Sequence, residues 1–504
     1  MKRLPIKLYS VALAATLALT SSCQDYLDIN RDPNNLTEVP VQFLLPGSQV
    51  GTGFLLGNTI QNVNSLWVQH IAGTGTQTDP YDRYNINPAD LNNEWNGLYA
   101  NLLDDLKEVE AKGQAEGNFQ HAGKAQVLQA YVWAVVTDTW GDVPFQQAHR
   151  FTEFPQPNYD PQQEVYAGLI TLLDAGIANL GKGNVIPATS GDLIYPVAAT
   201  SADQWIRAAN SIKLKLYLQS RHKNANSAAA INALIAGNRL ITSNANNFNV
   251  EFFGTSGSQN PMYQYHHLTR ANDQLISTRF YDSLTVLNDP RIPYLMTRVN
   301  NSTYVTYENG VHTSTPFVSP NRSRWGVYIV GNGPETASGT INNGGAAPFR
   351  MITSYMVKFW LAEAALTLGT TGTPATYFEE ALRDHFEDIR TFTVANAATF
   401  NPARDTYIAS RLAAFQAKNS TLGKLNVLIR DKWVTTTGNA YEAYNDYRRT
   451  GFPRLALPQN RLPGVTRIPT RWPYVQEEIQ ANSENVPIQD YPSGLLVPVW
   501  WMPQ

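Results

Sequence analysis

The chain has 504 residues, of which 43% are hydrophobic and 16% are charged, and its formal net charge is −3. This composition is typical of a large folded body and excludes a disordered chain. A near-neutral charge also excludes the strongly basic class of nucleic-acid-binding proteins. The 11 tryptophans and 25 tyrosines either fill the core or offer ring faces to a ligand.

The N-terminus has the parts of a bacterial export signal. Lys2, Arg3 and Lys7 form a basic segment, and residues 8–20 are apolar and uncharged. That apolar run is too short to span a bilayer, which takes about 20 apolar residues. We therefore expect residues 1–22 to be a signal peptide and residues 23–504 to form a single domain, because no linker divides them.

Cys23, the only cysteine of the chain, follows the small residues Ser21 and Ser22. This arrangement resembles a lipoprotein cleavage site, although Thr20 stands where a branched aliphatic residue is usual. The alternative is an ordinary secretory signal with a chance cysteine. A single cysteine can form neither an intrachain disulfide nor a cysteine metal cluster. We therefore expect Cys23 to be acylated and to anchor a soluble body to a membrane.

Four polar residues after the cysteine fall at the first, third, fifth and seventh positions of a calcium-binding loop: Asp28, Asn30, Asp32 and Asn34. However, Pro33 stands where that loop needs glycine, and Val39 stands where it needs a bidentate glutamate. The sequence therefore predicts a turn at residues 32–35 rather than a metal site.

Apolar residues that recur with helical spacing predict a mainly α fold. The clearest helix is residues 202–222, where Trp205, Ala209 and Ile212 share one face. The same pattern predicts further helices at residues 91–112, 119–140, 161–180, 351–368, 374–393, 402–417 and 422–436. Gly141 and Pro144 should end the second of these, with Asp142 as a cap or turn residue. Short links between several helices favour helical hairpins, although no 34-residue consensus repeats.

Four long stretches lack helical spacing: residues 47–87, 247–270, 297–349 and 450–504. Irregular segments of this length in a compact domain are usually either functional or disordered. Their aromatic residues argue against disorder, so we expect these loops to carry the ligand surface.

Motifs of hydrolytic and metal chemistry are missing from the sequence, which contains no H-E-x-x-H and no G-x-S-x-G. Gly51, Gly53 and Gly57 only approach a dinucleotide-binding pattern and follow no predicted strand. Glu363 lies near an apolar helix face and needs a partner there. We expect no catalytic residue, no metal site and no cofactor.

Eight strings in order along essentially the whole chain resemble the SusD/RagB family of outer-membrane nutrient-binding lipoproteins, and its SusD-like second subgroup in particular. They are YLDINRDPNN (26–35), WGDVPF (140–145), WIRAANSIKLKLYLQSR (205–221), NDPRIPYL (288–295), YMVKFWLAEAAL (355–366), DKWVTTTGNAYEAYNDYRRTGFPRL (431–455), RIPTRWPYVQEEIQAN (467–482) and VPVWWMPQ (497–504). Lys215 stands where the family commonly has arginine, and Thr470 interrupts the basic, proline-rich tail motif.

The resemblance implies a scaffold of tetratricopeptide-like helical pairs whose long loops carry the ligand surface. It implies a cell-surface lipoprotein that binds oligosaccharides or polysaccharide without chemistry and delivers them to a SusC-like TonB-dependent transporter in the outer membrane. Asp25 and Asp28 resemble a surface-export tag, and Glu363 is expected in an ion pair between helices. Two alternatives remain: a secreted helical glycoside hydrolase or lyase, and a peptide-binding relative of the same family.

Three loop stretches combine aromatic rings with polar groups, as a sugar site requires. The candidate ligand-binding residues are Trp67, Tyr81, Arg83 and Tyr84 in the first stretch, Tyr263, Tyr265, His266 and Arg270 in the second, and Arg324, Trp325 and Tyr328 in the third. Trp67 alternatively belongs to the core. Trp325 and Tyr328 are the preferred sugar platforms.

Overall fold

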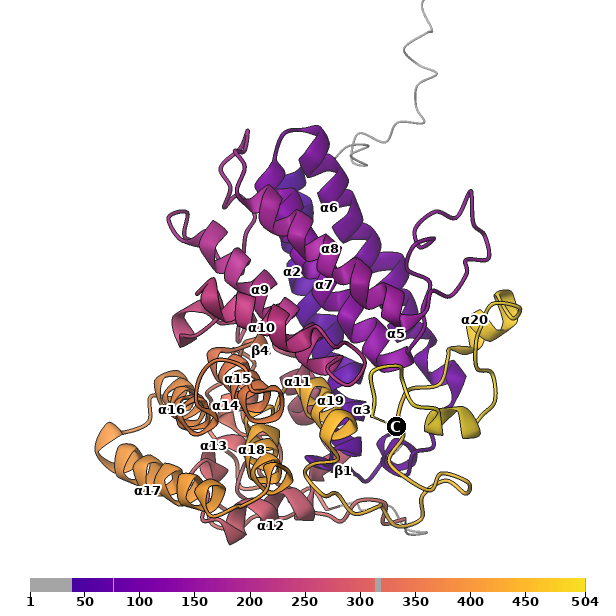
Figure 1. The fold of residues 1–504 in the computed structure, drawn as a ribbon. Coiled ribbons are helices and arrows are strands. Elements are labelled where there is room, and N and C mark those ends of the chain that lie inside the picture. Colours follow the sequence, from indigo (N-terminus) through magenta and orange to yellow (C-terminus); the bar gives the residue numbers. More distant parts are fainter. Residues whose placement is uncertain (1–38, 76, 313–318, 504) are drawn as a thin grey trace, which may run out of the picture.

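Helices account for most of the chain that the computed structural model describes, which is residues 39–75, 77–312 and 319–503 (Figure 1). The N-terminal half contains α2 (Val41–Leu55), α3 (Gln61–Trp67), α4 (Thr78–Asp82), α5 (Asn92–Asn96), α6 (Asp104–Ala115), α7 (Phe119–Trp140), α8 (Gln162–Leu180), α9 (Ser201–Gln219) and α10 (Ser227–Ala236). The C-terminal half contains α11 (Pro261–Tyr263), α12 (Thr278–Val286), α13 (Ile292–Leu295), α14 (Val327–Val330), α15 (Ser354–Leu368), α16 (Pro374–Thr393), α17 (Ala397–Gln416), α18 (Thr421–Thr435), α19 (Ala440–Thr450) and α20 (Gln476–Ala481). The expected signal peptide and Cys23 lie outside the described residues.

Short 3-10 and π-helical turns connect or extend these helices. The 3-10 turns are η2 (Pro88–Leu91), η4 (Asn244–Asn246) and η6 (Ser493–Leu496), and the π-helical turns are η1 (Leu56–Ile60), η3 (Gly97–Leu103) and η5 (Gln264–Thr269).

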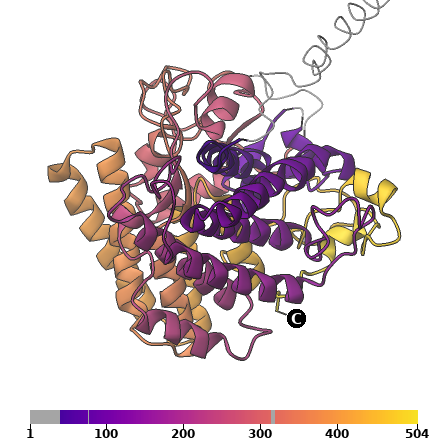
Figure 2. The ribbon, with the colours of Figure 1, turned by 90° about the horizontal axis from the view of Figure 1, so that it is seen from above.

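Consecutive helices pack as pairs, which confirms the mainly α fold of helical hairpins. In the N-terminal half α6, α7, α8 and α9 pack successively, and in the C-terminal half α15, α16, α17 and α18 do the same. Figure 1 shows the two groups as upper and lower parts of the molecule, and Figure 2 shows the N-terminal helices running beside one another. Helix α7 is buried nearly all round because it lies between α6 and α8.

Two small antiparallel sheets connect segments that are distant in the sequence. Strand β1 (Ile71–Gly73) pairs with β3 (Gln274–Ile276), with Ala72 opposite Leu275. Strand β2 (Phe248–Val250) pairs with β4 (Phe349–Ile352). The β1–β3 pair brings the first two predicted loop stretches together.

The expectation of an irregular stretch at residues 47–87 is wrong, because α2, η1, α3 and α4 cover much of it. Its glycines allow close packing instead of marking a loop. A Cβ on Gly53 would lie 2.7 Å from the Val250 side chain, and one on Gly57 would lie 2.8 Å from Pro261. The helix expected to begin at residue 402 begins at Ala397, because the Asn396 side chain accepts a hydrogen bond from the Ala398 N–H and caps it.

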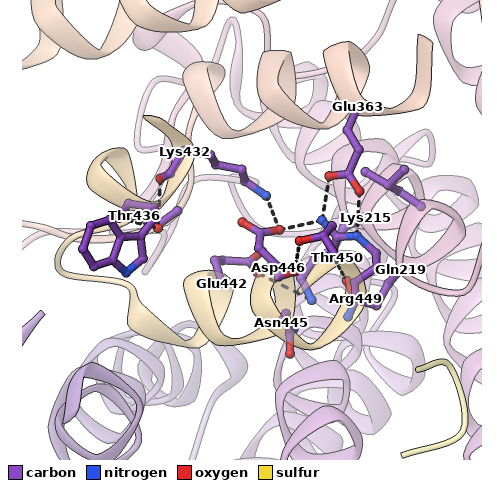
Figure 3. Close-up of polar contacts among 12 residues, drawn as sticks. Lys215, Gln219, Glu363, Lys432, Thr436, Glu442, Asn445, Asp446, Arg449 and Thr450 are labelled. Carbon is purple, nitrogen blue, oxygen red and sulfur yellow. Dashed lines mark hydrogen bonds and ion pairs between the residues drawn. The ribbon is translucent and has the colours of Figure 1, made fainter. Parts of the chain in front are cut away.

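A buried ion network holds α9, α15, α18 and α19 together (Figure 3). The Arg449 guanidinium donates to both carboxylate oxygens of Glu363, at 2.9 and 2.7 Å, and Arg221 lies 2.7 Å from the same carboxylate. Burial alone would raise the pKa of Glu363, but these two arginines outweigh it and lower the pKa to about 2. The expected ion pair at Glu363 is therefore confirmed.

Candidate functional site

The structure buries eight of the eleven predicted ligand-binding residues. They are Trp67, Tyr81, Tyr84, Tyr263, His266, Arg324, Trp325 and Tyr328. Trp325 is 0% exposed and Tyr328 is 1% exposed, so neither preferred platform presents a ring face to solvent. The expectation of exposed sugar platforms in the third stretch is corrected by this burial.

Trp325 and Tyr328 instead fill the body between the helices. The Trp325 ring packs against His70 and His266, at ring-centre distances of 6.3 and 5.8 Å. The Arg350 guanidinium lies 3.9 Å from the centre of the Tyr328 ring, and the Tyr328 hydroxyl is hydrogen-bonded to Asp388. These contacts give both aromatic residues a core role.

The side chains of Arg324 and His266 also make contacts within the protein that hold the loops in place. The Arg324 side chain donates to the carbonyl oxygens of Ala271 and Ser338, both at 3.0 Å, and so fastens two loop segments together. The His266 side chain contacts Asn62 in α3 at 3.1 Å. Burial lowers the pKa of His266 well below its usual value.

Trp67 lies in the core, which was the alternative role that the sequence allowed for it. Tyr84 packs on its ring edge to face, with 6.1 Å between the ring centres. Tyr263 stacks on the ring of His267 at 5.5 Å. His267 in turn contacts the Trp325 carbonyl oxygen at 3.0 Å, so the pair His266–His267 is committed to internal contacts.

Arg83 and Arg270 remain accessible, but each lies beside an acidic neighbour. Arg83 donates to Asp79 at 2.9 Å, and Arg270 lies 3.7 Å from Asp273. Arg270 is the more exposed of the two side chains.

Tyr81 and Tyr265 line one cavity of about 150 Å³. Its remaining walls are Thr59, Asn62, Val63, Leu66, Gln77, Thr78, Asp90, Asn93 and Glu94. Two aromatic rings among carboxyl, amide and hydroxyl groups form the mixture that a carbohydrate ring requires, because its faces are apolar and its rim is polar.

Four elements position these side chains. Helix α3 with η1 supplies one wall, α4 supplies Tyr81, the turn from η2 into α5 supplies the carboxylates, and η5 supplies Tyr265. The Thr74 N–H donates to the Asp273 carbonyl oxygen at 2.7 Å, continuing the β1–β3 contact beside the cavity. The sheet therefore fixes the distance between the two tyrosine-bearing segments.

The polar side chains of the cavity differ in whether they already have hydrogen-bond partners within the protein. Asp90 accepts from the Asn87 N–H at 3.0 Å in a capping box at η2 and also interacts with the Tyr81 hydroxyl. Burial, followed by the charges of Asp90 and Glu94, raises the pKa of Tyr81, so the phenol stays protonated. The Asn62 side-chain N–H2 has no hydrogen-bond partner among the described residues.

Glu94 is the second carboxyl group of the cavity. Burial raises the pKa of Glu94, while a hydrogen bond with Thr59 acts in the opposite direction. A protonated Glu94 would both donate and accept hydrogen bonds, which suits a neutral hydroxylated ligand.

Sequence reasoning found Tyr81 and Tyr265 but missed the polar residues around them. One signal was present: Gln61, Asn62, Asn64 and Ser65 crowd one short helix, and all four are buried. Of these four, only Asn62 lines the cavity, whereas Gln61 donates to Ser65 within the same helix.

Among residues 39–75, 77–312 and 319–503, no group of three or more His, Cys, Asp or Glu side chains is placed to hold a metal ion. Within the same residues, no helix combines the length and the apolar character needed to cross a bilayer.

A family model described as "Starch-binding associating with outer membrane", named SusD-like, second subgroup, matches residues 33–475 of this chain. No curated protein sequence matches the chain significantly.

Solved structures with the same fold come from several bacteria. A SusD/RagB family protein from Bacteroides thetaiotaomicron is 23% identical, covers 92% of this chain and 99% of its own, and has a TM-score of 0.73. A SusD homologue from Bacteroides fragilis is 19% identical, with the same coverage of 92% and 99% and a TM-score of 0.74. A chitin-binding SusD homologue from Flavobacterium johnsoniae is 20% identical, covers 91% of this chain and 98% of its own, and has a TM-score of 0.71.

Proposed function

This chain belongs to the SusD-like family of starch-binding proteins that associate with the outer membrane, and from that premise we propose that it binds oligosaccharides at the cell surface and performs no chemistry on them. The observation that carries this proposal is the cavity that Tyr81 and Tyr265 line together with amide and carboxyl groups. A sugar ring would lie against the tyrosine rings, and its hydroxyls would exchange hydrogen bonds with Asn93 and Glu94.

We propose the step that follows binding, which is delivery of the ligand, from the family to which the chain belongs. The protein would be anchored by an acylated Cys23 and would deliver oligosaccharide to a SusC-like TonB-dependent transporter. Co-purification from outer membranes tests this part, because a lipid-anchored partner of the transporter should be retained with it after mild detergent extraction. Recovery of the protein without a transporter would contradict the delivery step and would leave the proposed binding function unaffected.

A glycoside hydrolase or lyase is the second candidate, and one observation favours it: Asp90 and Glu94 line the same cavity, and burial raises the pKa of Glu94. Such a pair resembles the acid and base of a glycosidase. However, Asp90 is already engaged by the Asn87 N–H and the Tyr81 hydroxyl, which suits a structural carboxylate better than a catalytic one.

A panel of soluble polysaccharides separates binding from catalysis. Each is cast into a native gel and also incubated in solution with the purified mature protein. Retardation in the gel without release of reducing ends supports the binding function. Sustained release that is abolished by Glu94→Gln would assign a hydrolase or lyase instead. Including peptides as competitors tests the peptide-binding alternative.

A further inference from the structure

A groove of about 280 Å³ lies apart from the Tyr81–Tyr265 cavity, between α8, α9 and the C-terminal segment of the described chain. Helix α8 supplies one side of it, the end of α9 with the segment that follows supplies another, and Trp500 supplies a third. We call it the α8–α9 groove, and its lining includes Gln163, Tyr166, Tyr217, Lys223, Asn224 and Trp500. The groove and the cavity have no lining residue in common.

Two large aromatic side chains of the groove remain partly exposed, Tyr217 and Trp500. Trp500 is held in place by two contacts with α8. Its backbone N–H donates to the Gln162 side chain at 2.8 Å, and its ring packs against the buried ring of Tyr166, with 5.6 Å between the ring centres. Because these contacts fix Trp500 before a ligand arrives, little side-chain freedom is lost on binding.

The segment between α9 and α10 (Ser227–Ala236) carries Lys223 and Asn224 and folds tightly onto the end of α9. The backbone N–H groups of Lys223 and Asn224 donate to the Ser220 carbonyl oxygen, at 2.8 and 2.9 Å. The Ser227 hydroxyl donates to the Tyr217 carbonyl oxygen at 2.8 Å and ties the start of α10 to the same helix. The backbone therefore holds this polar segment in a fixed position at the groove.

Lys223 is the one charged residue, among those that the structure describes, that lines the groove. Its side chain is exposed and forms no ion pair with a described residue. The Tyr81–Tyr265 cavity has the opposite character, because Asp90 and Glu94 line it and no described lysine, arginine or histidine does. The groove therefore favours an anionic ligand, whereas the cavity disfavours one.

The other polar side chains of the groove can bind hydroxyl groups. The Gln163 amide, the Asn224 side-chain N–H2 and the Tyr217 hydroxyl have no hydrogen-bond partner among the described residues, and none of them is sealed from solvent. A phosphate group is best matched by the paired donors of arginine, and no described arginine lines the groove. One lysine beside amides and aromatic rings better suits a carboxylate on a hydroxylated ring.

We propose that the α8–α9 groove binds a uronic acid residue of an acidic oligosaccharide, with an apolar face of the sugar ring against Trp500 and Tyr217 and its carboxylate beside Lys223. The ring hydroxyls exchange hydrogen bonds with Gln163 and Asn224. The groove is thus a second sugar site, which adds to the proposed function and does not depend on it.

Calorimetric titration and ligand-observed NMR of the purified mature protein test the site with trimers of galacturonate, glucuronate and mannuronate. Each acidic trimer is compared with the neutral trimer obtained by reducing its carboxylates to alcohols. We expect at least one acidic trimer to bind about threefold more tightly than its reduced counterpart, because an exposed lysine–carboxylate pair contributes modestly. Added salt should diminish this preference, because it screens exposed charges. No preference for any of the three acidic trimers would overturn the proposal.

Substitutions at the groove locate the site. Lys223→Gln should abolish the preference for the acidic trimer and leave binding of the neutral trimer unchanged. Lys418→Gln, at an exposed lysine between α17 and α18, is the matched control and should retain the preference. Trp500→Ala should weaken binding of both trimers, and its thermal unfolding shows whether it is folded. An acidic preference that survives Lys223→Gln would contradict the proposal whatever Trp500→Ala does.

Two further comparisons separate this site from its alternatives. Tyr265→Ala, in the other cavity, should keep the preference for the acidic trimer, and its loss there would place the acidic sugar in that cavity and overturn the proposal. Binding of N-acetylglutamate amide as tightly as the acidic trimer would show that the groove recognises a peptide carboxylate instead of a sugar. If only the function proposed for the Tyr81–Tyr265 cavity fails, neutral polysaccharides are not retained while binding that depends on Lys223 persists.

Discussion

Tyr81 and Tyr265 line the same cavity, although α4 carries the first and η5 carries the second. The antiparallel pairing of β1 with β3 brings these two segments together, with Gly73 opposite Gln274. The cavity therefore depends on a long-range contact of only three residue pairs, and side chains that favour this pairing support the site without touching a ligand.

Trp325 should matter for stability rather than for recognition. Its side chain is 0% exposed, so Trp325→Ala leaves a large void and should lower the free energy of unfolding by about 3–5 kcal/mol. Urea denaturation followed by circular dichroism measures this change. Phe253→Ala, at a ring that is 64% exposed, is the control and should change little. A stable Trp325→Ala protein that no longer binds oligosaccharide would contradict this core role and would support Trp325 as a ligand-binding residue.

Arg449 should be among the most costly charges to remove. Arg449→Leu leaves the buried carboxylates of Glu363 and Asp446 without their shared partner, and should destabilise the protein by about 3–5 kcal/mol. Arg383→Leu breaks an exposed pair with Glu379 and should cost about 1 kcal/mol or less. The comparison is made by urea denaturation at neutral pH. Equal losses in the two variants would show that the network of Figure 3 contributes no more than surface charge.

Asp82 should make stability depend on pH. Burial raises its pKa to about 7, against the hydrogen bonds that it accepts from Asn309 and the Gly310 N–H. Because the folded pKa exceeds the unfolded value of about 3.9, the stabilising contribution is complete below pH 4 and is lost as the pH rises to 7. The free energy of unfolding of the wild type should therefore fall relative to that of Asp82→Asn across this range. Parallel curves for the two proteins would rule out this titration.

Cys23 should determine where the protein is found in the cell. Cys23→Ala removes the sulfur that acylation requires, so if Cys23 is the anchor the protein should leave the outer-membrane fraction. Ser21→Ala, which preserves a small residue before the cysteine, is the matched control and should remain in that fraction. Fractionation and immunoblotting report the distribution. Membrane retention of Cys23→Ala would contradict lipidation and favour an ordinary secretory signal.

The sequence predicted helices best where their ends carry chemical signals. The helix at residues 119–140 matches α7 at both ends, because Gly141 adopts φ +88° directly after Trp140. Asp142 also acts as expected, since its carboxylate accepts from the Gln162 N–H at the start of α8. By contrast, α10 and α19 were not predicted. Helix α19 carries many charged residues, and they face the buried ion network rather than solvent.

The binding surface was harder to predict, because a sequence does not show which loops fold inward. Trp325 and Tyr328 lie in a long stretch with little regular structure, yet Arg324 and Arg350 fasten that stretch into the body. Strands β1 and β3 have three residues each, too few for a periodic signal. Their pairing decides that Tyr81 and Tyr265 meet.

Calorimetric titration of Tyr265→Ala with an oligosaccharide that the wild type retains tests the central claim most directly. Tyr265 is half-buried at the cavity, so its removal should weaken binding about tenfold while thermal unfolding stays close to that of the wild type. Tyr377→Ala, at a half-buried tyrosine of α16 outside the cavity, should bind as the wild type does. Unchanged affinity in a folded Tyr265→Ala protein would contradict the assignment of this cavity as the oligosaccharide site.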